Sequence, residues 1–499
     1  MGGYLNFHCN FNAFADIFYR SVQDHSYFSK QLISPTKEIW NVEYSQPNTH
    51  KALHVGHLRG LVLGDALCNL LSYLSIQVIR TTYPGDFGAH VAKTLWYLSH
   101  PSPKAPPKEN KAKWLGEKYA QADEAYKKLK GTDEEAKVKK IISEILFSLS
   151  KQEGPYYELW KETREWSLDE LKSIYSWLRC QFDVWYFESQ CEESSIKLVK
   201  QKFQEGFFVQ DQGAIGIDLS QWKLGFALFL KSDGNGLYLT KDLELLFKKF
   251  SNTNVTKLIY IVDSRQKLHF QQLFKTAELL GFSQAKDSEH LAYETVNTPE
   301  GTPFSSRQIN GTSLLELKSK MEEKVTNDYL ERYRGHWKDE EIAEQAKNVT
   351  IGAIKYGMLK VDSCTQVKFS LEEWLRLDGE TGPYLQYVHA RCHSILEKIT
   401  DDKNSEKTFA LHEKNEQELL YSLSRFNEIV LTAALQHRPH QLACYLYDVC
   451  KIFNRFYESS SIKNATGNIR YTRLALVDLT KTILNKGLEI LGIPAPLKM

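Results

Sequence analysis

Hydrophobic and polar positions follow two different periods along the first hundred residues. Residues 38–46 (EIWNVEYSQ) and 76–83 (IQVIRTTY) are rich in aromatic and β-branched residues, which predicts two strands. Between them, apolar residues recur at helical spacing from His57 onward, at Leu58, Leu61, Val62, Ala66, Leu70 and Leu74. Strand, loop, helix and strand form a βαβ unit, and such folds bind ligands at the carboxyl ends of their strands. The loop before His57 is therefore a candidate ligand site.

The rest of the chain divides into three regions. Residues 101–180 change to Pro- and Lys-rich sequence and long charged helical segments, which predicts a helical insertion with a solvated face. Strand patterns return at 214–219, 226–232 and 257–263, and from about residue 340 the pattern is almost wholly helical. We therefore expect an α/β nucleotide-binding core of the Rossmann-like type, followed after a boundary near residue 370 by an all-helical domain.

Composition narrows the class of protein. The 499 residues carry a formal net charge of +1, so any polyanion must be bound by a local basic surface. No apolar run is long enough to span a bilayer, and the amino terminus lacks the pattern of a secretory signal. Eight cysteines are scattered without a Cys-x-x-Cys pair, which favours a reduced, cytoplasmic chain and makes a cysteine-based zinc site improbable.

The stretch NTHKALHVGHLRG (48–60) places two histidines at the start of the predicted helix. Zinc proteases place two histidines four residues apart around a glutamate, whereas His54 and His57 are three apart with no glutamate between them. A second interpretation is two polar residues that cap the helix. In the third, Gly56 lets an adenine ring lie against bare backbone, and the imidazole N–H groups beside the helix terminus bind phosphate oxygens.

Other motifs favour the third interpretation. His-Val-Gly-His resembles the His-Ile-Gly-His signature of class I aminoacyl-tRNA synthetases, and VEYSQPNTHKALHVGHLRG resembles the arginyl-tRNA synthetases in particular. The stretches GDFGAH (85–90), YLTKDL (238–243), SRQKLHFQQL (264–273), GETGPYLQYVHAR (379–391) and the ending GLEILGIPAPLKM follow in the order of that family. The resemblance covers nearly the whole chain, and five ordered motifs are far more specific than one tetrapeptide.

The second class I signature is a Lys-Met-Ser-Lys-Ser loop whose lysines stabilise pyrophosphate. The matching stretch here is PFSSRQING (303–311), with Pro303 in place of the first lysine, and Ser305, Ser306 and Arg307 remain as ATP-binding candidates. Arginyl enzymes often carry a lysine just ahead of the histidine signature instead, where Lys51 stands. A charge that neutralises the β- and γ-phosphates can come from either side.

The resemblance also implies an arginine pocket. A guanidinium is a planar, permanently charged fork, so a selective pocket needs a carboxylate placed for bidentate contact. Carried over from the family motifs, the residues that bind arginine are Asp242, Tyr238, Gln266, Glu43 and Asn48, with Thr240 as a helix cap and His269 facing the nucleotide. Without the motif match, each of these would be read as an ordinary surface or core residue.

The helical part carries a second candidate surface. Residues 450–464 and 468–477 interleave basic and aromatic residues, so cations can meet phosphates while rings offer faces for unpaired bases. The resemblance makes this region the anticodon-binding domain, and the tRNA-binding candidates are Arg455, Tyr457, Lys463, Arg470 and Arg473. The alternative is an amphipathic helix pair whose aromatic residues, such as Phe456 and Tyr471, belong to the core.

The domain boundaries expected from these motifs are 1–30, a remnant of an amino-terminal domain that contacts the tRNA elbow, 31–370, the catalytic domain, and 371–499, the anticodon-binding domain. In this family arginine attacks the α-phosphate of ATP, and the arginyl group then passes to the terminal ribose of tRNA. Magnesium is expected with ATP, without a dedicated protein site, and tRNA is expected to be needed for the first step.

The resemblance implies a ligase with tRNA, arginine and ATP as partners, acting as a monomer away from membranes. Two rival functions remain. The first is a noncatalytic tRNA-binding or scaffold paralogue, which the altered PFSSRQ loop would favour. The second is a nucleotidyl transferase acting on a small molecule, which leaves the helical half unexplained.

Overall fold

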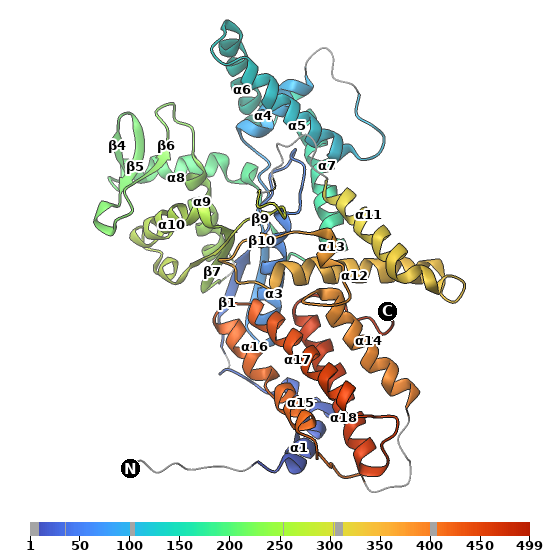
Figure 1. Cartoon of the computed structure of the whole chain (residues 1–499). Helices are drawn as coiled ribbons and strands as arrows, with labels where there is room; N and C mark the ends of the chain where they lie inside the picture. Colours follow the sequence, from blue (N-terminus) through green and yellow to red (C-terminus); the bar gives the residue numbers. More distant parts are fainter. Residues whose placement is uncertain are drawn as a thin grey trace.

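The computed structural model describes residues 9–34, 36–99, 105–252, 254–302, 304, 313–399 and 407–499. The molecule is elongated: a helical insertion stands at one end, the sheets lie in the middle, and a helical bundle forms the other end (Figure 1). The predicted order of an α/β core with a helical insertion, followed by a helical domain, is confirmed.

A five-stranded parallel sheet forms the centre of the α/β part. Its spatial order is β3-β2-β1-β7-β8, with bounds Val184–Trp185, Gln77–Thr82, Ile39–Glu43, Lys257–Asp263 and Glu289–Tyr293. Val42 of β1 lies in register with Arg80 of β2 on one side and Ile259 of β7 on the other. Because the strand order reverses between β1 and β7, the carboxyl ends of these two strands border the crevice where such sheets bind ligands.

Helix α3 (His57–Tyr73) begins at the predicted residue and connects β1 to β2. Most of its residues are buried, because it lies between the sheet and the helical domain. Gly64 is required at the sheet side, since a Cβ there would collide with the ring of Tyr44. The amino terminus of α3 is therefore held at a fixed place above the sheet.

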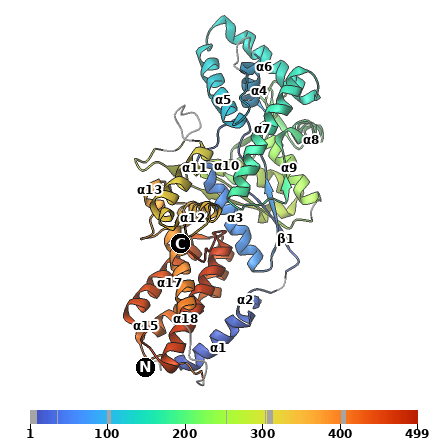
Figure 2. The same ribbon diagram turned by 90° about the vertical axis from the view of Figure 1, so that its right-hand side faces the viewer.

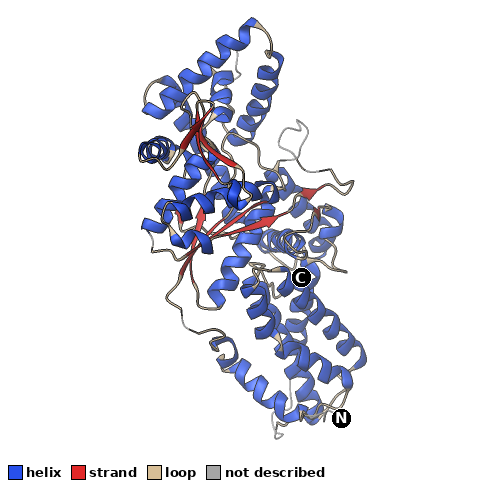
Figure 3. Cartoon of the chain, turned by 90° about the vertical axis from the view of Figure 1, so that its left-hand side faces the viewer, coloured by secondary structure: helices blue, strands red, loops and turns tan. Residues whose placement is uncertain are grey.

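The sequence predicts the helical insertion, and it predicts the two strands after the insertion without the sheet to which they belong. The predicted insertion contains α5 (Lys111–Lys128), α6 (Asp133–Lys151) and α7 (Pro155–Trp177), and α4 (Ala89–Leu98) precedes it. The predicted strands β5 (Ala214–Asp218) and β6 (Phe226–Leu230) exist. Together with β4 (Val209–Asp211) they form a separate antiparallel sheet in which β5 is the central strand (Figure 3). Helices α8 (Glu192–Gln204) and α9 (Tyr238–Asn252) pack against that sheet, and α10 (Lys267–Leu279) packs against α9 and against β8 of the central sheet.

A short parallel pair, β9 (Val296–Asn297) and β10 (Val367–Lys368), lies beside the central sheet. The helices near it are α11 (Leu314–Val325), α12 (Asp339–Leu359) and α13 (Leu371–Trp374). Helix α12 packs against α3, α11 and α14, so it joins the α/β part to the helical domain.

The helical domain consists of α14 (Gly382–Lys398), α15 (Lys414–Ser424), α16 (Phe426–Leu435), α17 (His440–Ser459) and α18 (Gly467–Ile490). Helices α1 (Phe11–Gln23) and α2 (Ser26–Ser29), from the other end of the sequence, pack against it (Figure 2). The side chain of Gln23 donates to Asp478 at 2.7 Å, and the hydroxyl of Tyr27 donates to the carbonyl of Ser424 at 2.8 Å. Among the described residues, no helix has the length and apolar character needed to cross a membrane.

Candidate functional site

Two imidazoles are locked together in the loop between β1 and α3. The backbone N–H of Gly56 donates to Nδ1 of His54 at 3.1 Å, and the backbone N–H of His54 donates to Nδ1 of His57 at 3.1 Å. The two ring centroids are 4.1 Å apart. Because Nδ1 of His54 accepts, its proton lies on Nε2, which is left as a donor for a ligand. A Cβ at position 56 would be 2.8 Å from the His54 ring, so glycine is needed for this arrangement.

Both imidazoles are neutral near pH 7. Burial, with Lys51 nearby, lowers the pKa of His54 to about 4, and the pKa of His57 falls well below its ordinary value for the same main reason. Burial lowers the pKa of His90 to about 4, and Lys241 and Lys51 add to this effect, so the ammonium of Lys51 acts on three histidines. The site therefore offers neutral N–H donors and one close cation, a combination suited to phosphate oxygens.

The competing interpretations of the histidine pair differ in support. Gly56, the N-cap of α3, has no side chain to cap the helix, but its N–H donates to Nδ1 of His54, so His54 fixes the start of the helix while its Nε2 stays open. In the part of the chain that the structure describes, no three His, Cys, Asp or Glu side chains are grouped so that they could hold a metal.

The loops after β1 and β2 are joined to each other. The backbone of Thr49 donates to the carbonyl of Gly85 at 2.9 Å, and Gly85 donates to the carbonyl of Pro47 at 3.1 Å. A Cβ at Gly85 would collide with the side-chain oxygen of Asn48, and Nε2 of His90 lies 3.3 Å from the Gly85 carbonyl. Asn48 is thus fixed between the two motifs, beside the histidine loop.

The predicted arginine-binding acids have different partners. Glu43, at the end of β1, is 4% exposed and forms a buried ion pair with Lys249 of α9. Asp242, in the second turn of α9, lies 2.6 Å from Nε2 of His269 on α10. The carboxylate of Glu43 is thus already neutralised, whereas Asp242 is one-fifth exposed and contacts an imidazole at its open side.

The remaining predicted residues of this pocket lie around Asp242. Tyr238, the first residue of α9, is 61% exposed, and Gln266 is exposed just before α10. Thr240, the predicted cap, lies in the first turn of α9. Its hydroxyl accepts from the N–H of Leu237, the residue before the helix, at 3.2 Å and donates to the carbonyl of Phe229, so it fixes β6 to the start of α9.

Glu188 is a site residue that sequence reasoning missed. It follows β3, is 6% exposed, and its carboxylate lies 3.2 Å from Lys241 of α9. Burial raises the pKa of Glu188 to about 7, against the opposing effect of Lys241, and Asp242 also acts on it. Its other oxygen would be 3.1 Å from a Cβ at Gly85, which places it beside Asn48. No motif or spacing in VWYFESQ could have indicated this position.

These contacts form three groups that act on one another electrostatically. His54, Gly56 and His57 form the first, Asn48, Gly85 and Glu188 the second, and Asp242 with His269 the third. Lys51 acts on His54, His57 and His90, and Asp242 acts on Glu188. The candidates Ser305, Ser306 and Arg307 lie outside the described residues. Phe304, which precedes them, donates its N–H to the carbonyl of Val296 and lies 4.0 Å from a Cβ built at Gly56.

The helical domain contains a basic cavity of about 620 Å³ between α14, α17 and the start of α18. Three of the predicted tRNA-binding residues, Tyr457, Lys463 and Arg470, line it together with Arg391 and Lys398 of α14. The guanidinium of Arg391 lies 4.1 Å above the ring of Tyr457. Sequence reasoning missed Arg391 and Lys398, although Arg391 ends the quoted motif GETGPYLQYVHAR.

Two predicted tRNA-binding residues lie elsewhere. Arg473 forms a 2.8 Å ion pair with the buried Glu416 and donates to the carbonyl of Ser461, so its guanidinium is used within the fold. Arg455 pairs with Glu418 at the surface. Phe456 is fully buried and Tyr471 packs on Phe409, as the core alternative expected.

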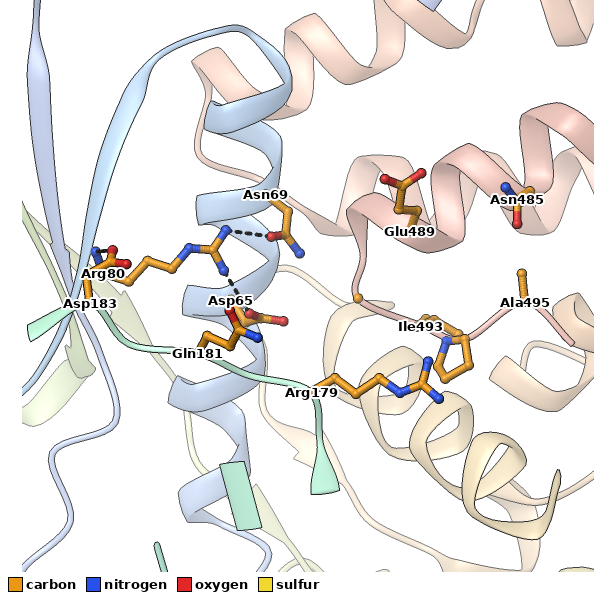
Figure 4. Close-up of a pocket in the computed structure, with 12 residues that line it drawn as sticks. Asp65, Asn69, Arg80, Arg179, Gln181, Asp183, Asn485, Glu489, Ile493 and Ala495 are labelled. Carbon is orange, nitrogen blue, oxygen red and sulfur yellow. Dashed lines mark hydrogen bonds and ion pairs between the residues drawn. The ribbon is translucent and has the colours of Figure 1, made fainter. Parts of the chain in front are cut away.

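A larger cavity of about 720 Å³ lies on the other side of α3 and contains none of the predicted residues (Figure 4). Asp65 and Asn69 of α3 line it with Arg80 of β2, and the end of α18 closes it. It marks the junction between the α/β part and the helical domain, away from the histidine loop.

Comparisons with known proteins agree with this geometry. Residues 22–371 match the family model "tRNA synthetases class I (R), catalytic domain", and residues 385–499 match the "DALR anticodon binding domain". The chain is 43% identical over 500 residues to the arginine–tRNA ligase of Bdellovibrio bacteriovorus, covering all of this chain and 86% of that protein. It is 31% identical to the enzyme of Clostridioides difficile, covering all of this chain and 87% of that protein.

Among solved structures, the arginyl-tRNA synthetase of Thermus thermophilus superposes with a TM-score of 0.82 at 27% identity, covering 96% of this chain and 86% of that one. A relative with this identity and coverage, and two family models that together match most of the chain, lead to one conclusion. The chain belongs to the arginyl-tRNA synthetases, class I enzymes with a DALR anticodon-binding domain.

Proposed function

We propose that this arginyl-tRNA synthetase performs both of its steps in the region between the histidine loop and Asp242. The observation that supports the proposal most is the junction of the loops after β1 and β2 at Gly85, which holds Asn48 beside Glu188, a carboxyl group on which Asp242 acts. This arrangement allows the triphosphate and the guanidinium of arginine to be bound side by side, as a common arginyl adenylate requires.

ATP is proposed to bind over the amino terminus of α3. The neutral Nε2–H groups of His54 and His57 would donate to phosphate oxygens that gain charge as the α-phosphate is attacked. Lys51 supplies the positive charge near the leaving pyrophosphate, which fits a loop whose first lysine is replaced by Pro303. Gly56, His269, Ser305, Ser306 and Arg307 complete the proposed ATP-binding set.

Arginine is proposed to bind with its guanidinium at Asp242. The carboxylate is partly exposed, and a guanidinium would share or replace its contact with His269. Tyr238 and Gln266 border the same space, and Asn48 lies toward the histidine loop, suited to the carboxylate end of the substrate. Glu43, paired with Lys249, would act on the α-amino group from beneath.

Magnesium is proposed to enter with ATP. The described residues offer no grouped ligand set of their own, so the phosphates would supply most of its ligands. The proposed ATP-binding residues would then orient the complex of magnesium and ATP.

The helical domain is proposed to bind tRNA through the basic cavity. Lys398, Lys463 and Arg470 can neutralise phosphates, and the Arg391–Tyr457 pair offers a charged, flat surface for an unpaired base. The proposed domain limits remain 31–370 and 371–499, and the family matches to residues 22–371 and 385–499 support them. We also propose that the enzyme acts in the cytoplasm as a monomer.

Pyrophosphate exchange with arginine, measured with and without tRNA, tests the proposal. We expect exchange only when arginine and tRNA are both present, because tRNA is proposed to complete the site. Asp242→Asn should raise the KM for arginine at least 10-fold, since a planar cation loses its anionic partner, and change the KM for ATP less than about 2-fold. Asp211→Asn, at an exposed position of β4, is the control.

Exchange that is absent under every condition would support the scaffold alternative instead. Equal losses for arginine and ATP in Asp242→Asn would contradict the assignment of Asp242 to the arginine pocket.

A further inference from the structure

Arg59 connects the start of α3 to a loop that also faces the helical domain. It lies two residues after His57 and is fully buried. Its Nη2 donates to the carbonyl of Asp362 at 2.9 Å and, more weakly, to that of Val361 at 3.4 Å. Its Nε and Nη1 have no hydrogen-bond partner among the described residues. Burying unpaired N–H groups is costly, and burial lowers the pKa of Arg59 to about 10.

The side chain of Asp362 contacts the helical domain, on the side away from Arg59. Its carboxylate lies 3.4 Å from Nδ1 of His440 and 3.6 Å from Nε of Arg438, both at the turn between α16 and α17. The backbone N–H of Cys364 also donates to it at 2.9 Å. Burial alone would raise the pKa of Asp362, but the N–H of Cys364, His440 and Arg438 bring it below its ordinary value. Asp362 is therefore a charged residue bound to α3 by its carbonyl and to the helical domain by its carboxylate.

The loop that contains Asp362, residues 361–368, also contacts the segments that lead to Phe304, beside the histidine loop. The carbonyl of Ser363 accepts from Glu294, and Val367 in β10 pairs with Val296 in β9. Val296 in turn accepts from Phe304, which lies beside Gly56. A shift of residues 361–368 would therefore displace both the histidine loop and the segment that leads into the PFSSRQ motif.

Docking of the helical domain does not depend on Asp362 alone. His437 forms a 2.9 Å contact with Glu289 of β8, and Asp65 of α3 pairs with Lys355 of α12 at 2.8 Å beside Gly492. The cavity in Figure 4 lies at this second junction. Removing the contacts of Asp362 should therefore leave the domains attached while changing how the start of α3 is held.

We propose that Asp362 is a positioning residue that couples the α16–α17 turn of the helical domain, through Arg59, to His54 and His57. Arg438 and His440 contact the carboxylate of Asp362 while Arg59 donates to its carbonyl, so a movement of the turn shifts the residue to which Arg59 is bound. This inference rests on the proposed binding of tRNA to the helical domain, and it gives that binding a physical route to the ATP site.

The test uses the full chain with Arg438→Gln, Asp362→Asn and the double variant. Exchange and charging rates at saturating tRNA give kcat, and filter binding gives the Kd for tRNA. We expect each single variant to lower kcat about 5-fold, within the range of coupling residues, while the Kd for tRNA changes less than about 2-fold. The double variant should lose no more than the single ones, because both substitutions break one connection.

Arg425→Gln is the matched control, since Arg425 is an arginine of the same domain whose guanidinium pairs with Glu428, away from Asp362. It should change neither kcat nor Kd. Arg438 is 55% exposed, so its variant is expected to fold even if Asp362→Asn does not.

The coupling would be overturned if the decreases in kcat multiplied in the double variant. It would also be overturned if the variants changed the Kd for tRNA instead of kcat. An unchanged kcat in Arg438→Gln would overturn it as well. A wild-type chain that is inactive with tRNA would instead overturn the proposed function and this inference together.

Discussion

At the scale of single residues, the site contains two buried carboxylates in different states. Glu43 is matched by Lys249 in direct contact, whereas Glu188 shares Lys241 with Glu192, which lies closer to that ammonium. Burial consequently outweighs pairing at Glu188 and raises its pKa to about 7. A fraction of the chains therefore carries a protonated Glu188 at neutral pH.

The raised pKa of Glu188 predicts that arginine binding depends on pH. Because the pKa is raised, Glu188 is mostly protonated at pH 6 and mostly ionised at pH 8, so an adjacent guanidinium should bind better at the higher pH. The KM for arginine should fall about 10-fold between these pH values. In Glu188→Gln the KM should be high and independent of pH, whereas Glu193→Gln, at an exposed position nearby on α8, should keep the wild-type profile.

The motifs predicted those residues whose roles depend on local sequence. His54, Gly56 and His57 lie at one helix start, and Asp242 lies in the second turn of α9, within the motif YLTKDL. Glu188 and Arg391 reach their sites through tertiary packing, since β3 is only two residues long and Arg391 depends on its neighbour Tyr457 in α17. Spacing along the chain carries no information about such contacts.

At the scale of elements, local pattern predicted the strands but not always their partners. β7 is buried over five consecutive residues, as a central parallel strand requires, and its pattern was recognised. β8 (EHLAY) has mixed polarity and partial burial throughout, so no alternation marks it. β5 and β6 were recognised as strands, but only tertiary structure shows that they belong to a separate sheet.

Helices α12 and α14 approach closely where the two parts of the molecule meet. A Cβ at Gly382 would collide with the carbonyl of Gly352, so backbone lies against backbone there. Gly382→Ala should lower the free energy of unfolding by about 3 kcal/mol, because neither helix can retreat without losing other contacts. Urea unfolding followed by circular dichroism measures this loss.

Gly236→Ala provides the control, since a Cβ there would be 3.5 Å from its nearest neighbour. A change in stability within about 0.5 kcal/mol is expected for it. Comparable losses in both variants would contradict the helix contact as the cause, because a Gly→Ala change without a steric clash should not destabilise the fold.

At the scale of the whole molecule, a net charge of +1 means that tRNA affinity depends on local cations. The basic cavity of α14, α17 and α18 is the proposed source. Replacing Lys463 by alanine should weaken tRNA binding and reduce the slope of log Kd against log salt concentration by about 1. Arg425→Gln should leave the slope unchanged, and equal slopes in both variants would contradict a phosphate contact at Lys463.

The packing of α1 on the helical domain has a consequence for synthesis. Tyr27 bonds to Asn427, 400 residues later in the chain, and Gln23 bonds to Asp478, which is more distant still. At about 5–20 residues per second, a ribosome needs roughly 20–80 s to make that interval. Throughout this time the apolar side of α1, with Phe18 and Val22, has only its neighbour α2 to pack on. This stretch of the nascent chain is thus exposed to aggregation until the helical domain has been made.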